Sequence, residues 1–280
     1  MYLLLAMMSA VLFGVWQFAI AQYRGRIPRE MVVFTCSGAA GVAYLVVGIA
    51  SGNFTLTPGD VGEGLLGGLF NLAGTLAILK AYEMGKIGVV TGVGATYALI
   101  PLAYSFLLGE ALGPLAGVGL ALILVGLAIF YVPAVRQRVP GETNSLQGIL
   151  VALLAATFWG LAVIVLDLGT KVSVTGTMFI SMIPQVAVAL VLAVAVKKVW
   201  GGMDRRSTGV IIGAGLAVAL GQIMFYTAAN MGDIGVVAVL GSMSPLVTTV
   251  LALVLLREKM HRLETVALVV VVAGTALVAA

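Results

Sequence analysis

The chain has 280 residues, of which 61% are hydrophobic and only 9% are charged. Soluble domains carry about 25% charged residues, and a soluble globule of this size has too little interior to bury so much apolar surface. The formal net charge of +4 does not indicate nucleic-acid binding, because the basic residues lie in short stretches beside apolar segments, where orientation in a membrane explains them. The composition therefore excludes a soluble protein and indicates a polytopic membrane protein.

Ten long intervals of the chain contain no Lys, Arg, Asp or Glu, and each is a candidate spanning helix. In chain order they are residues 1–23, 31–59, 64–79, 87–109, 111–135, 143–166, 172–196, 207–232, 234–256 and 265–280. Eight of them reach the roughly 20 residues that a helix needs to cross about 30 Å of hydrocarbon. The interval 64–79 gains length if Glu63 and Lys80 reach opposite interfaces. The pattern predicts an all-α integral membrane protein with ten transmembrane helices.

The basic residues alternate from one loop to the next. Fourteen of the fifteen Lys and Arg residues lie in loops that follow odd-numbered helices, and only Lys171 lies in a loop after an even-numbered helix. Loops rich in Lys and Arg face the cytoplasm. We therefore expect both termini to be external. The short loops, without an organelle retention signal, favour a bacterial inner (plasma) membrane.

Two segments of the chain repeat each other. Residues 81–90 (Ala-Tyr-Glu-Met-Gly-Lys-Ile-Gly-Val-Val) and 228–237 (Ala-Ala-Asn-Met-Gly-Asp-Ile-Gly-Val-Val) are identical at seven of ten positions, at an offset of 147. The same offset, within one residue, relates Gly14 to Gly160, Gly94 to Gly241, Leu108-x-Glu110 to Leu256-x-Glu258, and Gly126 to Gly274. The chain is therefore two copies of one unit.

The boundary between the copies is the polar run 133–145, which has the proline and glycine of a linker. We predict a first five-helix repeat over residues 1–132, a cytoplasmic linker over 133–145 and a second five-helix repeat over 146–280. Because five is an odd number, the second copy enters the membrane with the opposite orientation. Inverted repeats of this kind can rock against each other around a site near the midplane and give alternating access.

Short motifs recur in corresponding places of the two halves. They are the pairs Phe13-Gly14 and Trp159-Gly160, the turns Met84-Gly85-x-Ile87-Gly88-Val89-Val90 and Met231-Gly232-x-Ile234-Gly235-Val236-Val237, and Glu110 and Glu258. With these motifs, over nearly its whole length, the chain resembles the EamA-type branch of the drug/metabolite transporter superfamily. The resemblance implies a transporter, since members export amino acids, drugs and other metabolites or import small nutrients. Small four-helix relatives carry a coupling carboxylate in their first helix, whereas residues 1–23 here contain no Asp or Glu.

The predicted membrane interior has no charge at mid-depth. Lys80 lies near the end of its span, and the lack of a deeper cation argues against a phosphorylated or nucleotide-sugar substrate. Glu83, Asp167 and Asp233 also fall near helix ends, where either they line a vestibule or, as we expect, they are solvated.

We predict that the substrate is bound by the mid-depth polar and aromatic residues of helices 1, 3, 4, 6, 8 and 9. They are Trp16, Gln17, Asn71, Thr75, Tyr97, Trp159, Gln222, Tyr226, Ser242 and Ser244. Each intramembrane amide either bonds across helices or faces a wet cavity. The two Trp residues occupy nearly corresponding places. Either they pack in the core, or with the two Tyr residues they form an aromatic wall for an apolar or quaternary-ammonium group.

Prolines and glycines within the spans predict bends and close helix packing. The prolines within helices 4, 7 and 9 each remove a backbone hydrogen bond and bend the helix, and they are Pro101, Pro184 and Pro245. The small-residue pairs are Gly64 with Gly68, Gly88 with Gly92, and Gly209 with Gly213. We expect these pairs to bring helices close together.

These observations predict a secondary transporter that moves small neutral or zwitterionic metabolites, such as amino acids, outward by alternating access. The alternative within transport is a carrier of choline-like quaternary ammonium compounds or drugs. A membrane enzyme would need a motif such as a P-loop, a histidine cluster or paired catalytic acids, and a channel would need a charged ring or a carbonyl filter. The sequence has none of these.

The sequence also limits cofactors and partners. Cys36 is the one cysteine and His261 the one histidine, which excludes an internal disulfide and a multi-histidine metal site. We therefore expect no cofactor and no metal. The expected partners are a small-molecule substrate and the lipid bilayer, with no nucleic acid, and the expected working unit is a monomer.

Overall fold

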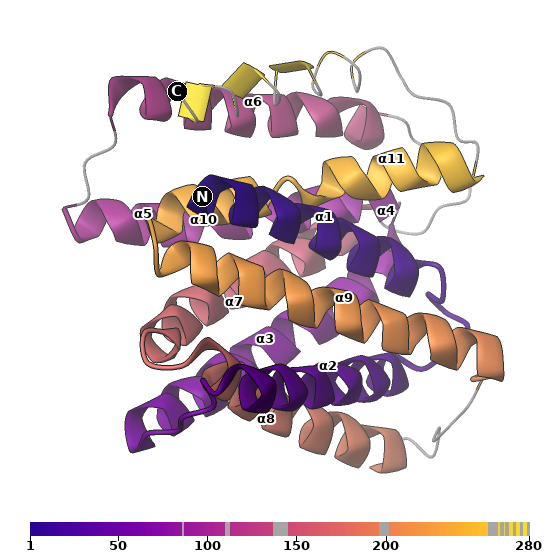
Figure 1. The fold of residues 1–280 in the computed structure, drawn as a ribbon. Coiled ribbons are helices and arrows are strands. Elements are labelled where there is room, and N and C mark those ends of the chain that lie inside the picture. The colour runs from indigo at the N-terminus through magenta and orange to yellow at the C-terminus, as the bar shows by residue number, and fades with distance from the viewer. Residues whose placement is uncertain are drawn as a thin grey trace.

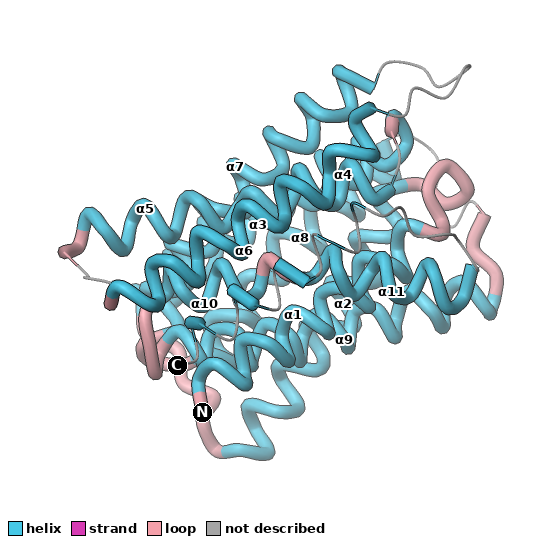
Figure 2. Tube along the Cα trace, turned by 90° about the horizontal axis from the view of Figure 1, so that it is seen from above, coloured by secondary structure: helices cyan, strands magenta, loops and turns pink. Residues whose placement is uncertain are grey.

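The computed structural model describes residues 1–85, 87–109, 113–136, 145–195 and 202–256, together with residues 263, 266, 269–270, 273–274 and 277–278. Its elements are α1 (Tyr2–Ala21), α2 (Arg29–Ser51), α3 (Pro58–Met84), α4 (Ile87–Ala95), the 3-10 turn η1 (Thr96–Ala98), α5 (Leu99–Leu107), α6 (Pro114–Arg136), α7 (Ser145–Thr170), α8 (Val174–Ala195), α9 (Arg205–Ala229), α10 (Ile234–Gly241) and α11 (Ser244–Leu256). The long helices lie side by side, with α6 at one edge of the bundle and α2 and α8 at the other (Figure 1). Figure 2 shows that the described residues form helices joined by short loops, with no strand among them. The predicted all-helical fold is confirmed for the described residues.

Nine of the ten predicted intervals contain at least one helix among the described residues. Seven helices or helical runs among the described residues are long and apolar enough to cross a membrane, namely α1, α2, α3, Val90–Leu107, Gln147–Thr170, α8 and α9. Shorter apolar helices cover Pro114–Gly126 and Ile234–Thr248. The tenth predicted interval, 265–280, lies largely outside the described residues, as do Glu110 and Glu258.

The third span is longer than its charge-free interval. The sequence predicted 64–79, whereas α3 has 27 residues and runs from Pro58 to Met84. Its start is fixed by a capping box, in which the Thr57 hydroxyl accepts from the Asp60 N–H at 3.3 Å and the Asp60 carboxylate accepts from the Thr57 N–H at 2.9 Å. Both charged residues expected to flank the span, Glu63 and Lys80, are therefore inside the helix.

Two other boundaries differ from the predicted ones. The second interval extended to residue 59, but α2 ends at Ser51 because Gly52 adopts φ +70°, and its N–H bonds back to the carbonyls of the last turn. At the predicted linker 133–145, α6 continues as far as Arg136 and α7 begins at Ser145. Residues 137–144 of that linker lie outside the described residues.

Helix contacts follow a reciprocal pattern. Helix α3 packs against α7 and α8, while α9 packs against α1 and α2. Helix α7 also contacts α4 and α5, and α1 contacts α10 and α11. Under the sequence offset of 147, α1 corresponds to α7, α2 to α8 and α3 to α9. Each of these contacts therefore has a counterpart between the corresponding helices.

Glycines allow the close approach of α3 to its neighbours. A Cβ added at Gly64 would lie 2.8 Å from Ile180 Cγ2, and one added at Gly68 would lie 2.8 Å from Ser181 Cα. The packing role predicted for this pair is confirmed. It is wrong for Gly209 and Gly213, because both are exposed and a Cβ at either would meet nothing within 4 Å in the described part. The packing around Gly88 lies outside what the structure describes.

Replacing Gly68 by Ala should lower the free energy of unfolding by about 1–3 kcal/mol, because the methyl group overpacks the junction of α3 and α8. The matched control is Gly62→Ala on the same helix, where an added Cβ would meet nothing within 4 Å. The midpoints of thermal unfolding of both purified variants in detergent provide the measurement. Equal midpoints for G68A and the wild type would contradict the packing described for α3.

Candidate functional site

Two spanning segments are interrupted at corresponding positions. The fourth span changes from α4 to α5 through η1, and the ninth changes from α10 to α11 at residues 242–243. Pro101 and Pro245 lack the N–H that would bond the carbonyls of Tyr97 and Gly241 in a continuous helix. Irregular backbone at membrane depth is tolerated where it is buried in protein or lines a cavity, and paired interruptions of this kind indicate a binding site. Pro184, by contrast, lies within the uninterrupted helix α8.

A cavity lies beside these interruptions. It offers about 100 Å³ to the centres of water-sized molecules, which is room for several waters or a small metabolite. Nine of the ten predicted site residues line it, namely Trp16, Gln17, Asn71, Thr75, Tyr97, Trp159, Gln222, Tyr226 and Ser244. Tyr97 and Ser244 occupy corresponding positions at the two breaks, at the offset of 147. The structure thus brings together residues from six helices and both halves of the chain.

Ser242 does not line the cavity. Its side chain is completely buried, and its hydroxyl donates to the Val239 carbonyl at 2.7 Å. A serine at the end of a helix can satisfy itself on its own backbone in this way, so it needs no cavity.

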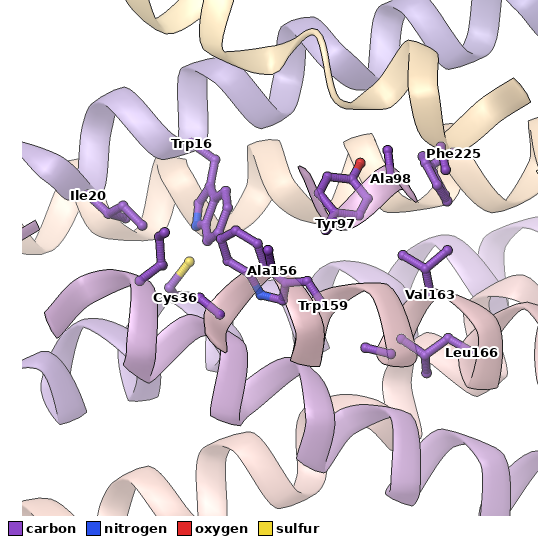
Figure 3. Packing of buried hydrophobic residues seen from close by; sticks show 14 of the residues in the cluster. Trp16, Ile20, Cys36, Tyr97, Ala98, Ala156, Trp159, Val163, Leu166 and Phe225 are labelled. Carbon is purple, nitrogen blue, oxygen red and sulfur yellow. The ribbon is translucent and has the colours of Figure 1, made fainter. Parts of the chain in front are cut away.

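Aromatic rings form one wall of the cavity. Trp16 from α1 and Trp159 from α7 point toward one another, with ring centroids 6.0 Å apart (Figure 3). Tyr97 meets Trp159 edge-on at 6.4 Å. The Trp159 indole N–H donates to the Thr75 hydroxyl at 3.4 Å, which fixes the ring against α3. Tyr226 packs edge-on against Phe225 at 5.1 Å instead. The wall leaves an apolar face that suits an aliphatic group or a cation.

Helices α2 and α8 contribute cavity residues that the sequence analysis missed. The Gln185 carbonyl oxygen accepts from Ser37 at 3.2 Å, and its amide donates to the Ser181 carbonyl at 3.1 Å. Cys36 also lines the cavity, and its sulfur lies beside the Trp16 indole (Figure 3). Gln185 is an amide within a charge-free span and meets the criterion that selected Gln17, so the signal for it was present in the sequence.

The described residues that line the cavity include no charged side chain. The ionisable groups nearest to helix ends were expected to be solvated, and this is wrong for Asp167, which is buried and paired with Lys171 at 3.1 Å. Glu83 pairs with Arg29 at 3.4 Å and with Lys80 at 3.1 Å. Such pairing stabilises a carboxylate where water is scarce.

Asp233 also has a structural role, at the start of α10. Its carboxylate accepts from the Val236 N–H at 3.0 Å and from the Ser105 hydroxyl at 2.9 Å. The same hydroxyl accepts from the Gly235 N–H at 3.0 Å. These bonds hold α10 against α5, so the Asp233 carboxylate ties together the two interrupted spans.

Comparison with known proteins supports one family. Residues 146–280 match the EamA-like transporter family. An uncharacterized transporter of Clostridium kluyveri is 24% identical over 253 residues, which cover 88% of this chain and 80% of that protein. These two matches support a transporter of the EamA type. A crystal structure of a protein 18% identical in sequence superimposes with a TM-score of 0.79, covering 99% of this chain and 95% of that one, and shows the same fold. The family match and the apolar helices together support an integral membrane protein.

Because Cys36 is the only cysteine of the chain and lines the cavity, a small methanethiosulfonate reagent should modify the folded wild type at one position. We expect slow reaction, since the residue is only 7% exposed. Intact-mass spectrometry in detergent measures the adduct, and Cys36→Ser is the unreactive control. Modification that occurs only after unfolding would contradict a cavity accessible to small molecules.

Proposed function

We propose that this EamA-type transporter is a secondary carrier of small neutral or zwitterionic metabolites, amino acids included. The observation that carries the proposal is one cavity at two helix interruptions, lined by aromatic rings and amides and, among its described lining residues, by no charge. Anionic phosphates need cationic groups in a low-dielectric site. A net-neutral substrate can instead be held by hydrogen bonds and apolar contact.

Alternating access between two inverted five-helix halves is the proposed mechanism. The reciprocal contacts of α3 with α7 and α8, and of α9 with α1 and α2, support two related halves. The family match begins at residue 146, where we place the second half, with 1–132 as the first and 133–145 as the linker. Cavity residues come from both halves, so rocking one half against the other would open the cavity to each side in turn.

The proposed setting is a bacterial inner membrane, with both termini external, a monomeric unit and outward transport. The alternation of Lys and Arg between loops supports this orientation. Outward transport follows the resemblance to exporting members of the superfamily.

The test is initial-rate uptake by purified protein in liposomes, with a panel of radiolabelled amino acids and choline, each with and without a pH gradient. Saturable uptake of an amino acid is the expected result. Insensitivity to pH is expected as well, because α1 has no carboxylate and none of the described residues that line the cavity is charged. Empty liposomes give the leak rate, and amino-acid uptake no faster than that leak would overturn the proposal.

A carrier of choline-like quaternary ammonium compounds is the second candidate, favoured by the facing rings of Trp16 and Trp159. If it is correct, Trp159→Leu should raise the KM for choline by roughly 30-fold, since a desolvated cation–π contact contributes about 2 kcal/mol. Trp16→Leu should act in the same direction. Phe70→Leu is the matched control, because Phe70 stacks on Phe158 and does not line the cavity. Unchanged choline kinetics in both Trp variants would refute this candidate.

A further inference from the structure

One amide in the cavity has a fixed orientation. Tyr44 on α2 is completely buried, and its hydroxyl donates to the side-chain carbonyl oxygen of Gln222 on α9. Among the described residues this oxygen is the only acceptor for that hydroxyl. A buried hydroxyl without an acceptor is costly, so the bond determines which end of the Gln222 amide faces Tyr44. The amide NH₂ is the end left for the cavity, which Gln222 lines.

The other two glutamines of the cavity are bonded differently. Both ends of Gln185 are occupied within the protein, by Ser37 and by the Ser181 carbonyl. Gln17 contacts the Thr248 hydroxyl at 3.4 Å, but that hydroxyl has the Gly14 and Ser244 carbonyls as alternative acceptors at 3.1 and 3.2 Å. The Thr248 hydroxyl has a single proton, which can bond either carbonyl instead. It therefore does not fix the orientation of the Gln17 amide. In the described part of the chain, the NH₂ of Gln222 donates to no protein group.

We propose that Gln222 presents its NH₂ as a fixed hydrogen-bond donor to the carboxylate of the substrate, and that Tyr44 is the residue that positions it. This inference rests on the proposed function and names the group that the site recognises. A neutral amide binds a carboxylate without burying a second charge, and more weakly than a guanidinium would, so the substrate can leave again. The aromatic wall of the same cavity offers π-faces to the substrate ammonium group. Together these groups suit a zwitterion.

The experiment compares L-leucine with L-leucinamide, in which a neutral amide replaces the carboxylate. Uptake of both is measured in liposomes for the wild type and for Gln222→Glu. Glutamate can still accept from Tyr44, but the donor becomes an anionic acceptor. We expect the wild type to prefer leucine. The variant should lose leucine uptake by roughly 10- to 100-fold and retain or increase leucinamide uptake.

Tyr44→Phe tests the positioning role, because it frees the Gln222 amide to rotate without changing the cavity wall. It should raise the KM for leucine while leaving kcat and leucinamide uptake close to wild type. The ratio of leucine uptake to leucinamide uptake should therefore fall. A purely structural role would lower both uptakes together. If Gln222→Glu does not fold, the double variant Y44F/Q222M removes both partners of the bond, which is better tolerated than orphaning one of them. Ser242→Ala, outside the cavity, should behave as wild type.

The outcomes separate the inference from the proposed function. If the wild type prefers leucine and the Gln222 variants lose that preference, the inference stands. If the wild type transports leucine and the variants keep its ratio of leucine to leucinamide, the inference is wrong and the proposed function stands. If the wild type transports no amino acid of the panel, both fail. A wild type that prefers leucinamide to leucine overturns the inference alone.

Discussion

A backbone inside a bilayer has no water to bond with, and this constraint governs the whole structure. Every spanning segment must satisfy its own N–H and C=O groups as a helix, except where irregular backbone is buried in protein or lines a cavity. In the described part of the chain, the spanning segments depart from helical geometry at η1 and at residues 242–243. Tyr97 of η1 and Ser244, which follows residues 242–243, both line the cavity. The neighbouring α1 and α7 pack across these breaks and keep them away from lipid. The position of the site is therefore a consequence of where the helices are interrupted.

Much of the candidate site was predictable from the sequence, because a polar residue within a charge-free span is stable only where it is hydrogen-bonded inside the protein or faces a wet cavity. Gln17, Asn71 and Gln222 cannot face lipid without cost, so their convergence on the interior follows from their presence. Serine is different, since its hydroxyl can bond the carbonyl of its own helix, as Ser242 does. Sequence alone did not distinguish Ser242 from Ser244, which lines the cavity.

Helix faces and helix ends were harder to predict. In a soluble protein the apolar stripe of a helix marks its buried side, but here the lipid-facing side is apolar too. The small residues of α3 and of α9 therefore looked alike, although Gly68 packs against α8 and Gly213 is exposed. The start of α3 depended on a cap at Thr57, seven residues before the charge-free interval begins. Charge patterns locate spans, whereas caps and packing set their limits.

The neutrality of the cavity has an electrical consequence. A charge carried across the membrane gains or loses about 2.3 kcal/mol for every 100 mV of membrane potential. None of the described residues that line the cavity is charged, and the buried Asp167 is matched by Lys171. A reorientation of this lining around a zwitterion therefore moves no net charge through the field. For the proposed zwitterionic substrate, the membrane potential therefore does not drive this step.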